Sequence, residues 1–143
     1  MSREEAVAVL EEREERVAIL SDSDVVRARQ VGRSLAASIG FSQTDQALIA
    51  TAISELARNI VLYARSGEVV VDALEDGGRR GMLVVARDEG PGIQDVERAL
   101  EAGFSTSGGL GLGLPGVRRL MDDMKVESKR GRGTTITARK WLR

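Results

Sequence analysis

The sequence predicts an α+β fold, a two-layer sandwich in which helices cover one face of a mixed, mostly antiparallel sheet. Two observations carry this prediction. Short apolar or β-branched runs recur about five times, and the later ones come in pairs separated by turn residues, which is typical of hairpins. Three or more longer stretches instead place apolar residues at helical spacing. Because strands and helices do not alternate strictly, a parallel βαβ fold fits the pattern less well.

The first half of the chain predicts one strand and two helices. Residues 16–20 form an apolar strand, and the Ser and Asp residues that follow are good N-caps for a helix over 25–39. A glycine comes directly after that helix and is placed to end it. Ser42 or Thr44 then caps a second, longer helix, whose apolar positions recur at helical spacing to about Tyr63.

The second half predicts two hairpins and two further helices. We expect a longer loop at 75–80 in the first hairpin and a turn at 131–133 in the second. Pro115 falls in the first turn of the later helix, where its missing N–H has no helical partner to lose. The expected strands are 67–73, 81–87, 126–129 and 134–141, and the expected helices are 95–102 and 114–124.

Length and charge predict one domain over 1–143, with residues 1–15 as an acidic extension. The 21 Lys and Arg residues nearly balance the 22 Asp and Glu residues, which argues against a general nucleic-acid binder. The charges are unevenly distributed, since residues 1–16 hold six Glu and three Arg, whereas residues 118–143 hold nine Lys or Arg and three Asp or Glu. Each end is either a docking surface for a protein partner or a solvated face.

The residue types that are missing exclude several kinds of chemistry. Without cysteine there are no disulfides, thiolate zinc sites or cysteine nucleophiles, and without histidine there is no Ser-His-Asp hydrolase and no histidine base. Any acid–base catalysis must therefore use carboxylates, lysines or Tyr63. No apolar run approaches the ~20 residues of a membrane span, and no signal-peptide pattern is present. We therefore expect a cytoplasmic protein with neither a nucleic-acid nor a membrane partner.

A carboxylate followed by glycines marks the first candidate site. Asp88 follows an apolar strand, and the sequence Glu-Gly-Pro-Gly after it turns the chain sharply. A carboxylate at a strand end can accept hydrogen bonds from a ligand amino group, while Gly90 and Gly92 let a ligand approach the backbone. An ordinary surface turn is the alternative, because Asp, Gly and Pro are all common in turns.

The second candidate is a polar pair on the long helix. Glu55 and Asn59 are four residues apart and share a face. A carboxylate there can accept a proton or orient an attacking hydroxyl, and an Asn oxygen is a hard, neutral ligand suited to Mg²⁺ on phosphates. The alternative is the polar face of a surface helix, on which Glu55 pairs with Arg58. Arg58 is also placed to meet a phosphate or a partner.

The third candidate is the glycine-rich segment 103–113. Successive glycine N–H groups before a helix N-terminus form an anion site. Residues 111–116 also match the dinucleotide motif G-x-G-x-x-G, but no strand directly precedes them and the chain is nearly over, so we do not expect that site. There is no P-loop motif. Later, Gly133 and Thr134 lie in a turn, where Thr134 either binds a ligand or belongs to a plain hairpin.

The four motifs appear in a characteristic order: E-x-x-x-N, D-x-G-x-G, G-x-G-x-G and a late G-x-G-T. Together they resemble the N box and glycine boxes of the GHKL (Bergerat) ATP-binding superfamily. Within it, the segments 54–59 and 103–111 and the ending Lys-Trp-Leu-Arg resemble the RsbT-like switch-protein serine/threonine kinases of the bacterial stressosome. The resemblance runs from about Val17 to the C-terminus and does not explain the acidic arm.

The resemblance implies a role for each site residue. Glu55 would be the base that prepares the acceptor serine or threonine, Asn59 would bind Mg²⁺ on the phosphates of ATP, and Asp88 would accept from the adenine amino group. Gly90 and Gly92 would let adenine approach. Gly109, Gly111 and Gly113 would cradle phosphate under a lid at about 104–108. The remaining residues of the nucleotide-binding set are Ser105, Thr106, Gly108, Leu110, Leu112 and Thr134.

The resemblance also implies two kinds of partner. The substrates would be STAS-domain proteins similar to RsbS and RsbR, and the kinase released from them would activate an RsbU-like phosphatase of the PPM type. Two other functions stay open. One is an anti-sigma-type binding module in which ATP only shapes a docking surface, and the other is a plain ATPase in which Glu55 activates water. Glu55 favours catalysis, because adhesion alone does not need a carboxylate one turn before the metal ligand.

Overall fold

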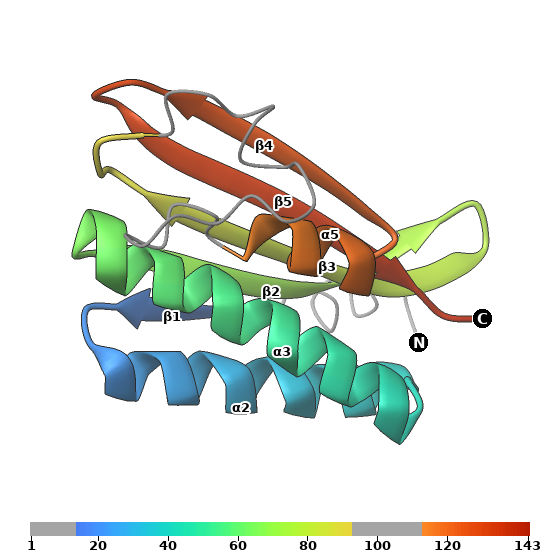
Figure 1. Cartoon of the computed structure of the whole chain (residues 1–143). Coiled ribbons are helices and arrows are strands. Elements are labelled where there is room, and N and C mark those ends of the chain that lie inside the picture. The colour runs from blue at the N-terminus through green and yellow to red at the C-terminus, as the bar shows by residue number, and fades with distance from the viewer. Residues whose placement is uncertain (1–13, 93–112) are drawn as a thin grey trace, which may run out of the picture.

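The computed structural model describes residues 14–92 and 113–143 (Figure 1). Its strands form one sheet in the spatial order first, second, third, fifth, fourth, and every pairing is antiparallel. The expected sandwich is confirmed, and no parallel pair occurs among these strands. The elements are β1 (Glu15–Ile19), α2 (Asp22–Ile39), α3 (Gln43–Asn59), the π-helix η1 (Ile60–Ala64), β2 (Gly67–Asp76), β3 (Arg79–Asp88), α5 (Leu114–Leu120), β4 (Asp123–Lys129) and β5 (Gly133–Trp141).

Caps define the ends of the two long helices. At the start of α2, Asp24 Oδ2 accepts hydrogen bonds from the backbone N–H groups of Leu20 (2.9 Å) and Ser21 (3.1 Å). At its end, Gly40 takes a left-handed conformation (φ +113°), as the expected glycine stop requires. Ser42 caps α3, because its Oγ accepts from the N–H of Asp45 at 3.1 Å.

The first hairpin is tighter than expected. Asp76 pairs with Arg79, so only Gly77 and Gly78 connect β2 to β3 and the expected longer loop at 75–80 is wrong. Both glycines have positive φ (57° and 85°), the conformation that a two-residue hairpin turn of matching twist requires. The strands can therefore continue through charged residues up to the turn.

Two expected helices differ from the structure in their last residues. The second helix is α-helical only to Asn59 and continues to Ala64 as a π-helix. The helix expected over 114–124 stops at Leu120, because the backbone of Met121 is extended and the N–H of Asp122 donates to the carbonyl of Arg139. Residues 123 and 124 belong to β4 instead. The helix expected at 95–102 lies outside the described residues.

The core lies between the sheet and the helices that cover one of its faces (Figure 1). Alternate residues of the strands point toward α2 and α3, as the two-residue period of a strand dictates. Gly32 of α2 lies against the side chain of Ile53 of α3, where a Cβ would collide, so this glycine allows the two helices to pack closely. The largest buried side chains are Val17, Ile19, Ile49, Ile53, Leu56, Ile60, Val69, Val71, Met82, Val84, Leu114 and Val117.

The segment Gln43–Ala64, which joins α3 and η1, qualifies the expectation that no stretch approaches a membrane span. By length and composition alone this 22-residue segment is apolar enough to cross a membrane. The mean hydropathy over a window of 18 residues is 1.3. Its side chains Ile49, Ile53 and Leu56 are buried in the core, which is the usual position of such a helix in a folded domain.

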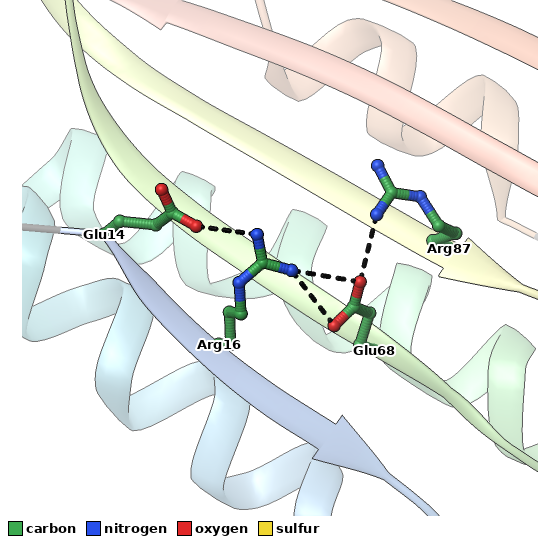
Figure 2. A network of polar contacts seen from close by, with 4 residues as sticks. All are labelled: Glu14, Arg16, Glu68 and Arg87. Atoms are coloured by element: carbon green, nitrogen blue, oxygen red, sulfur yellow. Dashed lines mark hydrogen bonds and ion pairs between the residues drawn. The ribbon is translucent and has the colours of Figure 1, made fainter. Parts of the chain in front are cut away.

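The other face of the sheet carries a charged network (Figure 2). Glu68 of β2 accepts from Arg16 of β1 at 3.3 Å and from Arg87 of β3 at 3.0 Å, and Arg16 also pairs with Glu14 at 2.9 Å. The network links three neighbouring strands. The two arginine side chains are more than half exposed, so each pair contributes little on its own.

Candidate nucleotide-binding and transfer site

The predicted site residues within the described ranges lie at the end of β3 and the start of β5, in the last turns of α3 and just before α5. Asp88 ends β3 and lies opposite Thr134 of β5 in the strand register. Two residues further in, Ala86 and Ile136 are buried in the core beneath the helices. Because side chains two residues apart in a strand point to the same face, Asp88 and Thr134 face the helix layer.

Asp88 is half-buried, and one of its carboxylate oxygens is used by the protein. Oδ1 accepts a hydrogen bond from the backbone N–H of Gly90 at 2.8 Å, which closes the turn after β3. Within the described residues, Oδ2 has no hydrogen-bond partner. The carboxylate is therefore held by one oxygen and can offer the other to a donor.

Gly67 connects this carboxylate to the helix layer. A Cβ on Gly67 would collide with the backbone oxygen of Arg87 and would lie 2.9 Å from Ile60 Cγ2 and 3.1 Å from Asp88 Cβ, so a glycine lets both β2 and η1 lie this close to the end of β3. Asn59 directly precedes Ile60. The absence of one side chain thus lets Ile60, the residue that follows the predicted metal ligand Asn59, pack beside the end of β3.

The glycines of the turn after β3 are packed against protein. A Cβ on Gly90 would lie 2.6 Å from Ala64 Cβ, and one on Gly92 would collide with the carbonyl of Lys129. The N–H of Gly131 also donates to the carbonyl of Pro91 at 2.7 Å, which ties this turn to the β4–β5 turn. The expected role of Gly90 and Gly92 in admitting adenine stays a prediction.

Thr134 is buried, with 7% of its surface exposed. Its Oγ1 lies 2.8 Å from Ser128 Oγ of β4, and either hydroxyl can be the donor. The preceding Gly133 has φ +89° and packs against the carbonyl of Asp88, where a Cβ would collide. Thr134 is thus a buried residue of β5 that pairs with the half-buried hydroxyl of Ser128, and it is not part of an exposed turn.

Glu55 lies between an arginine and a glycine. Its Oε1 pairs with Arg58 Nη1 at 3.2 Å, which is the contact that the surface-helix alternative predicted. On its other side, a Cβ on Gly113 would lie 2.5 Å from Glu55 Oε2. Gly113 has φ +66° and directly precedes α5, so the start of α5 packs on the last turns of α3. The structure therefore brings Glu55 and the last predicted phosphate-binding glycine together.

Asn59 is half-buried at the end of α3, one turn after Glu55. The described part of the chain contains no group of three or more acidic residues placed to hold a metal. Mg²⁺ usually binds through one or two protein oxygens and the substrate phosphates, and an Asn amide oxygen is suited to that. The donor that this chain offers fits a metal that arrives with a nucleotide.

The predicted residues Ser105, Thr106, Gly108, Gly109, Leu110, Gly111 and Leu112, and the lid expected at 104–108, lie outside the described residues. Sequence reasoning missed three residues that shape the rest of the site, namely Gly67, Ala64 and Ser128. A glycine at the first position of an apolar strand was a usable signal for Gly67. Nothing in the sequence marked Ala64 or Ser128, because both act through tertiary contacts.

The π-helix adds a feature that no pattern predicted. It follows Asn59 directly, and Ala64 in its last turn packs against Gly90. Arg65 comes next with φ +72°, a strained value that no other described residue except glycine adopts. Short π-helices and strained residues are frequent at functional sites. Here they carry the chain from Asn59 to the Asp88 turn in a few residues.

Comparisons with known proteins identify the family of the chain. Residues 20–140 match the histidine kinase-like ATPase domain. The chain is 54% identical to the serine/threonine-protein kinase RsbT of Bacillus subtilis strain 168 over 127 residues, which are 89% of this chain and 96% of that protein. It is 31% identical to an anti-sigma F factor of Thermoanaerobacter sp. strain X514, over 80% of this chain and 83% of that one.

A solved structure supports the fold alone. A chain of the SiaB–SiaC complex from Pseudomonas aeruginosa superposes with a TM-score of 0.58 over 99% of both chains, at 12% identity.

Proposed function

The chain belongs to the histidine kinase-like ATPase domain family and is an RsbT-like serine/threonine-protein kinase, and we propose that it transfers phosphate from Mg²⁺-bound ATP to STAS-domain proteins. The observation that carries the proposal is the placement of Glu55, which lies one turn from Asn59 and against Gly113. A base, a metal ligand and the end of a phosphate-binding segment are the parts that such a transfer needs.

Each residue has a defined task in this proposal. Asp88 would accept from the adenine amino group of ATP, and Asn59 would supply an oxygen ligand to Mg²⁺. Bound ATP supplies the phosphoryl group, whose bond to the ADP oxygen breaks as the acceptor hydroxyl attacks. Glu55 takes the proton of that hydroxyl. Catalysis is then mainly positioning and charge stabilisation, with a general base contributing about 10²–10⁴-fold.

The partners in the proposal are an acceptor and a second target. The acceptor is a STAS-domain protein of the RsbS or RsbR kind, and the second target is an RsbU-like phosphatase that the released kinase activates. The match to the RsbT kinase and to anti-sigma F factors supports a signalling role that depends on changing partners. We place this pathway in the cytoplasm, where ATP and Mg²⁺ are available.

A binding module that uses ATP only to shape its surface is the second candidate. The anti-sigma F factors to which the chain is similar favour it, since their name describes binding to a sigma factor. The two functions differ in whether phosphate reaches a protein. A plain ATPase would instead release phosphate to water at the same rate with and without an acceptor.

Glu55→Gln and Asn59→Ala together test the assignment. Incubation with labelled ATP, Mg²⁺ and a STAS-domain protein, followed by mapping of the phosphorylated residue, should show transfer to a serine or threonine by the wild-type chain. Glu55→Gln should lower the transfer rate by about 10²–10⁴-fold and leave nucleotide affinity nearly unchanged. Asn59→Ala should weaken both, because the metal is lost.

The matched control is Glu89→Gln, which removes an exposed carboxylate beside the Asp88 turn. It should transfer phosphate at the wild-type rate. Transfer at the wild-type rate by Glu55→Gln would instead show that the proton has another acceptor.

A further inference from the structure

We propose that Arg58 is a positioning residue for phosphoryl transfer, whose guanidinium group orients the carboxylate of Glu55 so that Oε2 faces Gly113 and the acceptor hydroxyl. The inference rests on the proposed function, because it takes Glu55 as the base. It assigns Arg58 a role in the reaction that the four nucleotide-binding motifs do not include.

The two oxygens of Glu55 have different surroundings. Oε1 pairs with Arg58 Nη1 at 3.2 Å, whereas Oε2 lies where a Cβ on Gly113 would approach to 2.5 Å. A hydrogen bond to Oε1 restricts rotation of the carboxylate about its last torsion, which is otherwise broad. The oxygen that remains for the acceptor is then the one beside the glycine-rich segment.

The ion pair is too exposed to be explained by stability. The side chains of Arg58 and Glu55 are 51% and 36% exposed, and solvent-exposed ion pairs contribute little to stability. Orientation has a larger effect on a reaction, since a misplacement of ~1 Å can cost a factor of about 10² in rate. The contact therefore matters more for transfer than for folding.

The place of Arg58 in the fold also suits this role. It is the basic residue in the last turn of α3, where a cation is favoured by the helix dipole. Its neighbour Ala57 is buried in the core and has no polar side chain, and the proposed function assigns Asn59 to Mg²⁺. Arg58 is thus the side chain of that turn that can hold Glu55 from the solvent side.

Steady-state kinetics of Arg58→Ala and Arg58→Lys, with a STAS-domain protein as acceptor, test the proposal. Arg58→Ala should lower kcat about tenfold and leave the KM values for ATP and acceptor within about twofold of the wild type. Arg58→Lys, which keeps a donor within reach, should recover most of the rate. The control Arg33→Ala removes an exposed arginine of α2 that forms no ion pair with the described residues, and it should change nothing.

A double-mutant cycle separates orientation of Glu55 from a direct contact with the acceptor. In a Glu55→Gln background, Arg58→Ala should cause no further loss, because two residues that act as a unit are not additive. A further tenfold loss in that background would overturn the proposal, as would a raised KM for the acceptor with kcat unchanged.

A crystal structure of Arg58→Ala provides a readout besides activity. We expect the Glu55 carboxylate to rotate away from Gly113 in this variant and to return in Arg58→Lys. A carboxylate that stays against Gly113 without the arginine would overturn the proposal. Failure of the wild-type chain to phosphorylate any STAS-domain protein would overturn the proposed function and the catalytic role with it, whereas a silent Arg58→Ala beside an active wild type would overturn this inference alone.

Discussion

At the residue scale, the two carboxylate oxygens of Asp88 have different surroundings. Oδ1 accepts from the Gly90 N–H, so the rotation of the carboxylate is restricted. An Asn in the same orientation would keep this bond with its carbonyl oxygen but would present an NH₂ group in place of Oδ2. Two donors would then face each other if the ligand is the adenine amino group.

Asp88→Asn should therefore weaken ATP binding by about 10–100-fold, since a mispaired buried group costs about 1–3 kcal/mol. Calorimetry with ATP and GTP measures the loss, and the wild type should prefer ATP because guanine presents a carbonyl at that position. Glu89→Gln is the neighbouring control. Equal affinities for ATP and GTP in the wild type would contradict the assignment.

Two aspartates should make opposite contributions to the pH dependence of stability. The hydrogen bond from the Leu20 N–H holds the pKa of Asp24 below its ordinary value, whereas burial raises the pKa of Asp72. At pH values above the ordinary pKa of an aspartate, ionised Asp24 therefore stabilises the fold. This stabilisation is lost as the pH falls through the pKa of Asp24 in the folded protein. Ionised Asp72 destabilises the fold. This destabilisation develops as the pH rises from the ordinary pKa of an aspartate through the raised pKa of Asp72.

Thermal unfolding of Asp24→Asn and Asp72→Asn between pH 3 and pH 7 measures both effects. At pH 7 we expect a lower Tm for Asp24→Asn and a higher Tm for Asp72→Asn. Both differences should shrink toward pH 3, where the wild-type carboxylates become protonated. A difference that is independent of pH would mean that the charge of that residue is not responsible.

At the scale of elements, the C-terminal segment holds α5 in place. Lys140 is 9% exposed, and its Nζ donates to the carbonyl of Leu120 at 2.7 Å, at the end of α5. Next to it, the N–H of Trp141 donates to Asp122 Oδ2 at 2.7 Å. These contacts join β5 to the junction of α5 and β4. Because Gly113 precedes α5 and lies against Glu55, these contacts connect the C-terminal segment to the surroundings of Glu55.

Lys140→Met keeps the apolar stem of the side chain and removes its donor. We expect the free energy of unfolding to fall by about 1–3 kcal/mol, because the carbonyl of Leu120 loses its partner in a partly buried contact. Urea titration measures the loss. Lys125→Met, at an exposed position of β4, should stay within about 0.5 kcal/mol of the wild type. Equal stability of the two variants would show that water replaces the Lys140 contact.

At the scale of the whole molecule, the acceptor must reach the proposed site. The acceptor hydroxyl has to approach Glu55, so we expect the footprint of the acceptor protein to include exposed residues around Glu55 and Arg58. A standard interface covers about 800 Å² of each partner. Phosphorylation adds about 1.5–2 negative charges to the acceptor beside Glu55 and the nucleotide phosphates. Repulsion should then promote release of the product.

We therefore expect the STAS-domain protein and the phosphatase to exclude each other. Surface plasmon resonance with the chain immobilised and saturated with unphosphorylated STAS-domain protein should show loss of phosphatase binding. A phosphorylated STAS-domain protein should bind more weakly and compete less. A stable ternary complex would contradict overlapping footprints without affecting the kinase assignment.

Sequence patterns predicted the elements well where local chemistry decides them. The spacing of apolar residues located α2, α3 and all five strands, because each buries one face against a single core. Patterns failed where the structure of a segment depends on contacts with residues distant in the sequence. The run from Leu114 to Met124 has helical spacing, but its last residues pair with β5, since Met124 lies opposite Ala138 and gains a strand partner. The two-residue turn at Gly77 and Gly78 was missed because the charged residues around it resemble a loop.

The sequence by itself determined which chemical groups this protein can use. The order of the motifs, with Glu55 and Asn59 on one helix and Asp88 at a strand end, follows from spacing alone and identified the family. Only the tertiary structure decided how the groups meet. Gly67 admits η1 beside Asp88, and Gly113 admits the carboxylate of Glu55, because a missing Cβ in each allows a close approach of distant segments. A sequence pattern records where the chain can turn or bury a face, whereas such contacts depend on which surfaces pack together once the core has formed.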